Sequence, residues 1–366
     1  MTSRRNCIRR LSVWAGATPL WCQASADPTL SNMLNVFDFE PVCKRKLPKA
    51  TYDFVEGGAW DEWTIQRNRD AFRRITFRPR LLAGVDSIDT STELFGVKLA
   101  SPIMIAPTGA QRRLHDEGEL ATRRGAAAAG SMMAVSTGSS MTLDQIAAAS
   151  ASPWIFQLYA MPDREGSRSR VEAAVRLGAK AILFTVDTPY LGSMERIQRN
   201  NLANGTPAAG ATKQFLAKLD WAFVRELAAY AKVPVYVKGV LTARGALLAV
   251  ENGAAGIIVS NHGGRVLDGA PSTIEVLPEI VAAVGSRTIV LIDSGFRRGA
   301  DVLKALALGA KGVFVGRPPL WGLGAFGADG VQRVMELLNR ELTLAMGLSG
   351  HPNLASIKRE LVHVDR

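Results

Sequence analysis

The ten residues SNHGGRVLDG, at positions 260–269, place a histidine and an arginine three residues apart in a glycine-containing loop. His262 is one of only four histidines in the 366 residues of the chain. A neutral imidazole accepts a proton near physiological pH, and a guanidinium binds a carboxylate through two parallel hydrogen bonds. We therefore predict that His262 is a base and that Arg265 beside it is an anion clamp, a side chain that binds a carboxylate. This pair would suit a reaction on a small organic acid. The alternative is a tight structural loop that happens to contain a histidine.

Three apolar runs end in side chains that could act with such a base. WIFQLY ends in Tyr159, AILFTVD in Asp187 and VPVYVK in Lys238. A lysine or aspartate after a buried apolar run costs free energy unless it is paired or functional. We interpret these residues as a phenol, a carboxylate that orients the imidazole, and an ammonium. Including these three, the polar or glycine positions that end the apolar runs are Pro107, Thr108, Gly109, Ser136, Gln157, Tyr159, Thr185, Asp187, Lys238, Ser260, Asp293, Gly295, Arg297, Gly316 and Arg317.

The last two of these runs end in glycine-rich turns that carry arginines. DSGFRRG contains Arg297 and GRPP contains Arg317. Cations beside the backbone N–H groups of a helix start form a phosphate site, which barrels often place after their seventh and eighth strands. We therefore predict a phosphate-bearing cofactor. Together with a base and an anion clamp, it suggests redox chemistry on an organic acid.

Eight short apolar runs must position these residues. Runs that are apolar on both faces are typical of buried parallel strands. The runs lie at 102–107, 132–137, 154–159, 181–187, 233–239, 256–264, 288–295 and 312–317. Helix candidates between them lie at 117–130, 164–178, 219–232, 242–253, 272–284 and 299–309. Several end at a glycine, as helix C-termini commonly do: Gly130, Gly178, Gly253 and Gly309.

Eight strands that alternate with helices predict an α/β fold, a closed (β/α)8 TIM barrel, whose strand C-termini face one common pocket. A doubly wound open sheet is the alternative. It would usually show GxGxxG after its first strand, and APTGAQRR does not supply that motif. We expect one domain over 35–366 with a short N-terminal helical extension, and a short loop from Gly192 to Leu219.

The composition excludes some classes of function. The net charge is +11, but Arg4, Arg5, Arg9 and Arg10 all lie in the first ten residues, and the remaining cations are scattered. This pattern argues against a nucleic-acid partner. We predict no metal, because no Cys, His and carboxylate spacing suggests one. The other histidines are interpreted as surface or packing residues: His115, His351 and His363.

Residues 1–26 have the layout of a secretory signal. Arg4 and Arg5 form a twin arginine, a moderately apolar stretch follows, and Ala24-Ser25-Ala26 resembles a cleavage site. The stretch is too short and interrupted to span a membrane, so we do not expect an integral membrane protein. We expect twin-arginine export to the periplasm, with a cytoplasmic location as the alternative. Cleavage would remove Cys7 and Cys22, so Cys43 could form no internal disulfide.

Several motifs between about residue 35 and residue 360 carry a family resemblance. They are SNHGGRVLDG, DTP at 187–189, VKGV at 237–240, DSGFRRG at 293–299, GVFVGRP at 312–318, LPKATYDFVEGGAWDEWT at 47–64 and PIMIAPTGA at 102–110. Together they resemble the FMN-dependent L-2-hydroxy acid oxidases and dehydrogenases. That family includes glycolate oxidase, lactate oxidase, mandelate dehydrogenase and 4-hydroxymandelate oxidase.

The resemblance implies an FMN cofactor and oxidation of an L-2-hydroxy acid to the 2-oxo acid. His262 would take the hydroxyl proton while a hydride passes to flavin N5, with a carbanion route as the rival description. Asp187 would pair with the resulting imidazolium, Tyr159 would hydrogen-bond the substrate, and Arg265 would hold its carboxylate. Lys238 would lie beside flavin N1–C2=O and stabilise the reduced anion.

The resemblance also implies the cofactor contacts. The residues expected to line the isoalloxazine ring are Pro107, Thr108, Gly109, Ser136, Gln157, Thr185 and Ser260. Asp293 is expected at the ribityl chain. The residues expected at the phosphate are Gly295, Arg297, Gly316 and Arg317.

Four positions depart from the family pattern. Phe54 stands where many relatives have a substrate-binding Tyr, and Met194 stands where an Arg is usual. Gly138 replaces a bulky residue of glycolate oxidases, and Ser294 replaces a Gly. The first three favour a substrate with a larger or more apolar side chain than glycolate.

The electron acceptor and the assembly are less constrained. Oxygen is one candidate acceptor, and a quinone or cytochrome is another if the chain is exported. The family is often tetrameric, so we expect a homo-tetramer. Two alternatives to the enzyme are a flavin-dependent diphosphate isomerase and a non-catalytic or atypical-substrate flavin protein.

Overall fold

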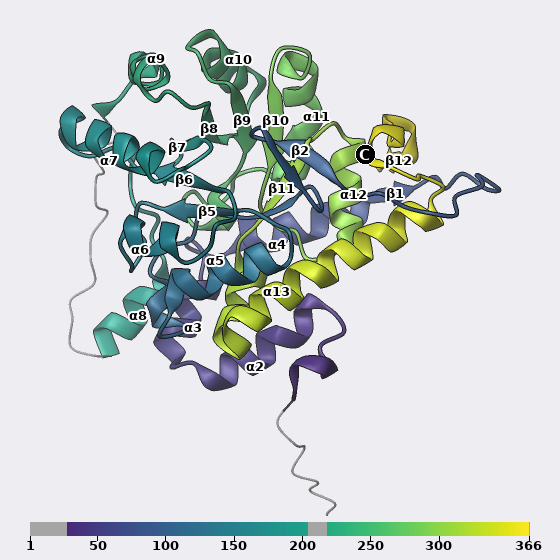
Figure 1. Cartoon of the computed structure of the whole chain (residues 1–366), viewed down its shortest axis with the longest axis horizontal. Coiled ribbons are helices and arrows are strands. Elements are labelled where there is room, and N and C mark those ends of the chain that lie inside the picture. Colours follow the sequence, from purple (N-terminus) through teal and green to yellow (C-terminus); the bar gives the residue numbers. More distant parts are fainter. Residues whose placement is uncertain (1–27, 204–217, 366) are drawn as a thin grey trace, which may run out of the picture.

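The computed structural model describes residues 28–203 and 218–365, and the predicted signal at 1–26 lies outside them. Eight parallel strands close into a barrel, with helices packed around the outside (Figure 1). The strands are β4 (Ile103–Ile105), β5 (Met133–Ser136), β6 (Trp154–Leu158), β7 (Ile182–Thr185), β8 (Val235–Val240), β9 (Gly256–Val259), β10 (Ile289–Ile292) and β11 (Gly312–Val315). β11 pairs with β4, which closes the barrel and confirms the predicted (β/α)8 fold.

The strands are short and buried on both faces, which explains their continuous apolar sequence. Side chains such as Met104, Ile155, Leu183, Ile258 and Phe314 fill the barrel interior, and those of alternate residues pack under the helices. The barrel is therefore a packed core, and only the ends of its strands are available for a site.

The predicted outer helices begin and end close to the expected positions. They are α5 (Gly118–Ala128), α7 (Arg164–Arg176), α9 (Trp221–Tyr230), α10 (Ala243–Glu251), α11 (Thr273–Val284) and α12 (Gly299–Ala307). Three further helices were not predicted: α6 (Leu143–Ala148), α8 (Glu195–Ala203) and α13 (Arg317–Leu348). The glycines that follow α5, α7, α10 and α12 have positive φ, the backbone conformation of a helix C-cap that glycine adopts without strain. None of the described helices is long and apolar enough to cross a membrane.

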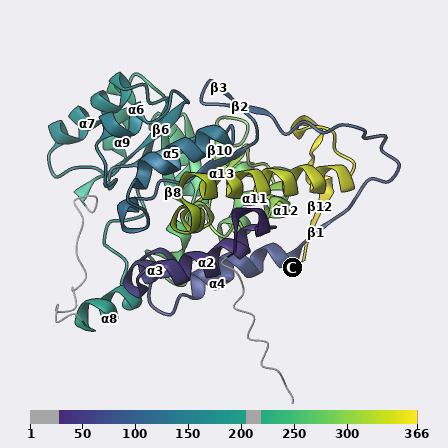
Figure 2. The same ribbon diagram turned by 60° about the horizontal axis from the view of Figure 1, so that its bottom comes forward.

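The N-terminal extension is helical, as expected. It contains α2 (Phe39–Lys46), α3 (Lys49–Glu56) and α4 (Trp63–Asp70), which lie together along one side of the barrel (Figure 2). α2 packs on α13, and α4 contacts the short 3-10 turn η6 (His262–Gly264). Two small antiparallel pairs complete the fold: β1 (Ile75–Phe77) with β12 (Val362–Val364), and β2 (Thr92–Leu94) with β3 (Val97–Leu99). The extension therefore reaches the loop that carries His262.

The segment from Gly192 to Leu219 differs from the predicted loop, because it contains α8. This helix packs against α3, where Asn200 donates a hydrogen bond to Asp53 at 2.9 Å. Arg196 forms an ion pair with Glu62. Contacts with the N-terminal extension, more than 130 residues away in sequence, stabilise this helix. Residues 204–217 lie outside the described part of the chain.

Candidate active site

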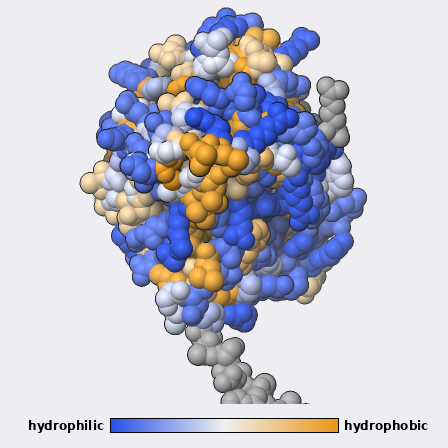
Figure 3. Space-filling view, turned by 90° about the vertical axis from the view of Figure 1, so that its right-hand side faces the viewer, coloured by the Kyte–Doolittle hydropathy of each residue, from blue (hydrophilic) through white to orange (hydrophobic). Residues whose placement is uncertain are grey.

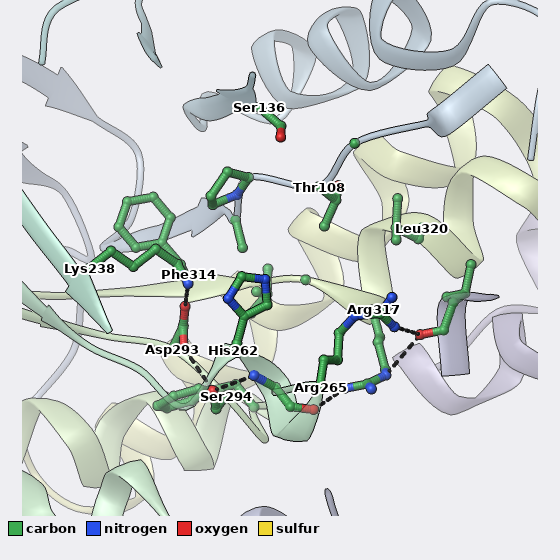
Figure 4. A pocket seen from close by; sticks show the side chains of 18 of the residues that line it. Thr108, Ser136, Lys238, His262, Arg265, Asp293, Ser294, Phe314, Arg317 and Leu320 are labelled. Carbon is green, nitrogen blue, oxygen red and sulfur yellow. Dashed lines mark hydrogen bonds and ion pairs between the residues drawn. The ribbon is translucent and has the colours of Figure 1, made fainter. Parts of the chain in front are cut away.

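A cavity of about 300 Å³ opens at the C-terminal ends of the barrel strands (Figure 4). Among the residues that line it are Phe54, Pro107, Thr108, Gly109, Ser136, Gly138, Tyr159, Lys238, His262, Arg265, Asp293, Gly295, Arg297, Gly316 and Arg317. The structure thus brings most of the predicted site residues together from seven different strand ends and from α3. We call this the central cavity.

The remaining predicted residues lie just behind its wall or beside it. Ser136 Oγ donates to Gln157 Oε1 at 3.1 Å, and Gln157 Nε2 donates to Thr185 Oγ1 at 3.0 Å. Ser260 lies beneath Lys238, and Asp187 lies behind His262. These buried groups position the polar atoms that face the cavity.

His262 sits between a carboxylate and a phenol. Its Nδ1 lies 2.9 Å from Asp187 Oδ1, and its Nε2 lies 3.3 Å from Tyr159 Oη. Burial alone would raise the pKa of Asp187, but His262 and then Lys238 outweigh it and hold that pKa below its usual value. Burial raises the pKa of Tyr159 to about 12, so the phenol keeps its proton at neutral pH. The carboxylate therefore fixes one ring nitrogen and leaves the other facing the cavity.

Lys238 is buried at the end of β8 and is paired. Its Nζ lies 3.1 Å from Asp293 Oδ2 and donates to Ser260 Oγ at 2.9 Å. Burial lowers the pKa of this ammonium, but Asp293, followed by Asp187 and Tyr159, outweighs burial and raises the pKa. The cavity therefore holds a permanent positive charge at this point.

Two arginines bind the C-terminal end of α3. Arg265 Nη1 donates to the carbonyl oxygens of Phe54 at 2.8 Å and Gly57 at 3.0 Å. Arg317 donates to the carbonyl of Val55 at 3.1 Å and also contacts that of Gly57. Cations are favourable where a helix exposes its last carbonyl groups. These contacts attach the N-terminal extension to the barrel and hold both guanidiniums at the cavity.

Arg265 and Arg297 carry positive charge that no carboxylate of the described residues neutralises. Burial, and then the neighbouring Arg317, lower the pKa of both Arg265 and Arg297 to about 10. Within the described ranges, neither guanidinium forms an ion pair with a carboxylate. Arg297 instead stacks over the ring of Trp321, 4.8 Å from its centroid. Buried cations of this kind require an anionic partner, so the cavity suits a ligand that carries a phosphate, or a phosphate together with a carboxylate.

Glycines shape two walls of the cavity. A Cβ on Gly109 would lie 2.5 Å from the carbonyl oxygen of Gly138, so these two loops touch through their backbones. Gly295 has φ +84°, and a Cβ there would lie 2.4 Å from the carbonyl oxygen of Asn68. Only glycine allows these approaches without displacement. A cavity with these close backbone approaches and a cationic end fits a planar ring that carries a phosphate chain.

A second cavity of about 250 Å³ adjoins the first and shares Tyr159, His262 and Arg265 with it. Its other lining residues are Ala160, Thr188, Leu191, Gly192, Met194 and Val266. Met194, predicted as a substrate contact, lies here and not in the central cavity. We call this the side cavity; its wall is mostly apolar, and it begins at His262 and Arg265.

Sequence reasoning missed several residues of the two cavities. Val55, Phe314 and Leu320 line the central cavity, and Leu191 and Val266 line the side cavity. Their apolar types carry no chemical signal, so no motif distinguishes them from core residues. Ser294 also lines the central cavity, and its place inside DSGFRRG was the available signal.

Comparison with known proteins defines the class. The FMN-dependent dehydrogenase family matches residues 43–364, and the chain belongs to that family. It is 44% identical to glycolate oxidase 1 of Zea mays over 353 residues, which are 90% of this chain and 96% of that protein. It is equally similar to glycolate oxidase of Spinacia oleracea, at 44% over 355 residues.

Solved structures give the same result. A lactate oxidase of Pediococcus acidilactici superposes with a TM-score of 0.86 at 38% identity, covering 91% of this chain and 95% of that one. A mandelate oxidase in complex with (S)-4-hydroxymandelic acid gives 0.84 at 40% identity, covering 91% and 99%.

These findings confirm an FMN-dependent oxidoreductase of the 2-hydroxy acid oxidase family, with FMN as its cofactor. They do not favour the alternatives of a diphosphate isomerase or a non-catalytic flavin protein. In the described part of the chain, no group of three or more His, Cys, Asp or Glu side chains is arranged to hold a metal ion.

Proposed function

We propose that this protein oxidises L-2-hydroxy acids whose side chain is larger and more apolar than that of glycolate, with His262 as the base. The observation that carries the proposal is the arrangement of His262, Asp187 and Arg265 where the two cavities meet. A substrate at this junction would have its hydroxyl at the imidazole, its carboxylate at the guanidinium and its side chain in the side cavity.

The local geometry assigns the proton to one atom. Because Nδ1 of His262 is occupied by Asp187, Nε2 is the nitrogen that faces the cavity and takes the proton of the substrate hydroxyl. Asp187 stabilises the imidazolium that results. FMN held in the central cavity would supply the two-electron acceptor that converts the alcohol carbon into the carbonyl carbon of a 2-oxo acid. His262 releases its proton to solvent after the product leaves.

The other polar side chains bind and orient. Tyr159 remains protonated and donates a hydrogen bond towards the substrate. Arg265 uses Nη1 on the backbone carbonyls of α3, and its other nitrogens bind the substrate carboxylate. The buried ammonium of Lys238 would stabilise negative charge on the cofactor ring when FMN is bound.

The predicted cofactor residues divide between the ring and the phosphate. The residues proposed to line the ring are Pro107, Thr108, Gly109, Ser136 and Lys238, and the residues proposed to support them from behind are Gln157, Thr185 and Ser260. Asp293 is proposed at the ribityl chain. The residues proposed at the phosphate are Gly295, Arg297, Gly316 and Arg317, and the unpaired, buried guanidinium of Arg297 supports this assignment.

The substrate class follows from Phe54, Gly138 and Met194. Gly138 leaves the central cavity open beside it, since the nearest atom to a Cβ there would be Ser136 Oγ at 3.6 Å. Met194, with Leu191 and Val266, gives the side cavity an apolar wall. Phe54 has no hydroxyl to bind a carboxylate, and its ring lies 5.4 Å from the Arg265 guanidinium. Among relatives, lactate oxidase and a mandelate oxidase bound to (S)-4-hydroxymandelic acid support substrates beyond glycolate.

Anaerobic flavin bleaching tests the proposal. The holoenzyme is mixed with glycolate, L-lactate, L-mandelate and L-2-hydroxyoctanoate, and the loss of flavin absorption is followed in a stopped-flow instrument. For each acid, the ratio of the flavin-reduction rate constant to the substrate dissociation constant is determined. We expect this ratio to be at least about tenfold higher for the larger acids than for glycolate, because burial of their apolar side chains strengthens binding. Fastest bleaching by glycolate would contradict the substrate class, and no bleaching by any acid would contradict the activity.

The same samples address the electron acceptor. The relatives named as oxidases favour oxygen, with a quinone or cytochrome as the second candidate. Reoxidation in air-saturated buffer, compared with reoxidation by a soluble quinone analogue, separates the two. Faster reoxidation by the quinone would favour the second candidate.

A homo-tetramer is also proposed. Leu81, Leu82, Leu344 and Leu348 are exposed large apolar side chains, and the loop of the first two packs beside Ser349 and Gly350 at the end of α13. Figure 3 faces this end of the molecule and shows apolar side chains gathered on it. Apolar surface of this kind supports association. Light scattering after size exclusion measures the mass directly, and a mass of one chain would contradict it.

Export is proposed on the residues 1–26 alone, because Arg4-Arg5 and Ala24-Ser25-Ala26 match a twin-arginine signal. N-terminal sequencing of protein from a periplasmic fraction is the test. A mature chain that starts after Ala26 would support export. An intact Met1 in the cytoplasmic fraction would support the alternative location.

A further inference from the structure

The backbone of the His262 loop is unusual. His262, Gly263 and Gly264 have φ values of +57°, +65° and +76°, so three consecutive residues are left-handed. A non-glycine residue in this region is uncommon and costs free energy unless the surroundings hold it there. The hydrogen bonds of this loop therefore decide where the imidazole points.

The peptide groups of Gly263 are held from two directions. Its N–H donates to Ser294 Oγ at 3.1 Å, and its carbonyl accepts from Arg317 Nη1 at 2.9 Å. Figure 4 shows these bonds as one continuous path along the floor of the cavity, with Arg317 at one end and Ser294 at the other. The residue next to the proposed base thus connects the phosphate side of the cavity with the turn after β10.

The path continues from Ser294 to Lys238. Ser294 Oγ donates to Asp293 Oδ1 at 2.7 Å, and Asp293 Oδ2 lies 3.1 Å from Lys238 Nζ. Lys238 Nζ donates to Ser260 Oγ at 2.9 Å, which also accepts from the N–H of His262 at 3.1 Å. The bonds form a closed ring that contains the backbone of the base and the ammonium proposed to face the flavin.

Ser294 is the member of this ring that nothing above assigns to a role. It is buried and left-handed at φ +75°, a conformation that suits glycine better than serine. Its hydroxyl is both donor and acceptor, and it bridges a backbone N–H and a carboxylate that do not otherwise meet. The two hydrogen bonds offset the cost of the backbone conformation.

We propose that Ser294 is a positioning residue that couples the His262 loop to the Asp293–Lys238 pair. Through this coupling, the imidazole of His262 keeps a fixed position relative to the ammonium of Lys238, which is proposed to face the cofactor. This inference rests on the proposed role of His262. Without the hydroxyl, the N–H of Gly263 loses its partner and Asp293 loses one donor. The loop then samples orientations in which the imidazole is misaligned.

Two substitutions separate the hydroxyl from the backbone. Ser294→Ala removes the hydroxyl and keeps the strained conformation, whereas Ser294→Gly removes the hydroxyl and relieves the strain. Ser131→Ala is the matched control, because Ser131 is also buried and donates to the carbonyl of Ile103 at 2.8 Å, outside both cavities. Each variant is compared with the wild type as apoprotein and as FMN-loaded holoenzyme.

Three quantities are measured: the FMN dissociation constant of the apoprotein by fluorescence, the limiting rate of flavin reduction, and the substrate dissociation constant. Both Ser294 variants should raise the FMN dissociation constant about fivefold and lower the limiting rate about tenfold, with the substrate dissociation constant within about twofold. Ser131→Ala should leave all three within about twofold of the wild type.

The proposal is overturned if both Ser294 variants keep the FMN dissociation constant and the limiting rate of the wild type. It is also overturned if Ser131→Ala lowers the rate as much, since the effect would then reflect general stability. If no 2-hydroxy acid reduces the wild-type flavin, the proposed function fails. The FMN dissociation constants still decide whether Ser294 positions the Asp293–Lys238 pair at the cofactor.

Discussion

The central cavity has two unlike walls. The wall from the ends of β4 to β7 consists mainly of short uncharged residues such as Thr108, Gly109 and Ser136, and the buried amide of Gln157 supports it. The wall from the ends of β8 to β11 carries Lys238, His262, Arg265, Asp293, Arg297 and Arg317. Asp187, after β7, does not line the cavity, and it pairs with His262 of the charged wall.

The difference shows how one barrel can separate the residues that bind the cofactor ring from those that take part in the reaction. A neutral, glycine-rich wall lets a flat ring approach the backbone and binds it through many weak hydrogen bonds. A wall of buried charges stabilises anionic groups and moves protons, because electrostatic interactions are stronger where water is excluded. We therefore expect substitutions of the proton-transfer residues at the charged wall to change rates, and those on the neutral wall to change cofactor affinity.

The largest effect is expected for His262→Ala. Removing the base should lower the rate of flavin reduction by about a thousandfold or more, because general base catalysis contributes on this scale. FMN should remain bound, since other residues hold it. The measurement is stopped-flow bleaching. His363→Ala is the control, because His363 is exposed on β12, and it should behave as wild type. An unchanged rate in His262→Ala would remove the assigned base.

Asp187→Asn should lower the rate by about a hundredfold. The amide cannot stabilise the imidazolium, and it removes the charge that supports proton transfer to Nε2. Substrate binding should change little, because Asp187 lies behind His262 and does not line either cavity. A rise in the substrate dissociation constant at an unchanged limiting rate would show that Asp187 acts in binding instead.

Arg265→Met should weaken substrate binding by about a hundredfold, and Arg265→Lys by about tenfold. A lysine keeps the charge but loses the bidentate geometry of the guanidinium. The dissociation constant from the bleaching titration is the measurement. Equal losses with the two substitutions would indicate that geometry, and not charge, dominates.

Gln157→Met tests the neutral wall and should have a smaller effect. The substitution removes the amide between Ser136 and Thr185 while keeping a similar volume. We expect the FMN dissociation constant to rise about fivefold and the limiting reduction rate to stay within about twofold. A rate loss as large as that of Asp187→Asn would contradict the division between the walls.

The smallest effect is expected in the pH dependence of the unfolding free energy of the apoprotein. Because the pKa of Asp187 lies below its unfolded value, its carboxylate stabilises the fold above about pH 4, and this stabilisation is lost as the pH falls through the folded pKa. The difference in unfolding free energy between wild type and Asp187→Asn should therefore shrink as the pH falls below about 5, and should be constant above that pH. Urea denaturation measures it, and parallel curves throughout would contradict the coupling.

Much of the fold could be predicted from local patterns. The eight strands were recognisable because a strand buried on both faces requires consecutive apolar residues, as in IMI of β4 and GIIV of β9. Gly178 and Gly309 marked helix ends because of the backbone conformation that they adopt. α8 was missed because its partners Asp53 and Glu62 are far away in sequence.

The site was predictable to a similar extent. Polar residues at strand ends were expected to converge, since all parallel strands of a barrel present the same ends to one pocket. The side cavity was not expected as such, because Leu191 and Val266 have the same apolar character as core residues. The capping of α3 by Arg265 and Arg317 also had no local signal.

The amino-acid sequence by itself determined the strand and helix periods, the chemical types at the strand ends and the glycine positions, because these depend on residues close together in the chain. Only the tertiary structure decided which groups meet: Nδ1 of His262 with Asp187, the N–H of Gly263 with Ser294, and two arginines with one helix end. These contacts join residues from different strands and helices, and their distances follow from how the barrel closes and how the N-terminal helices pack on it.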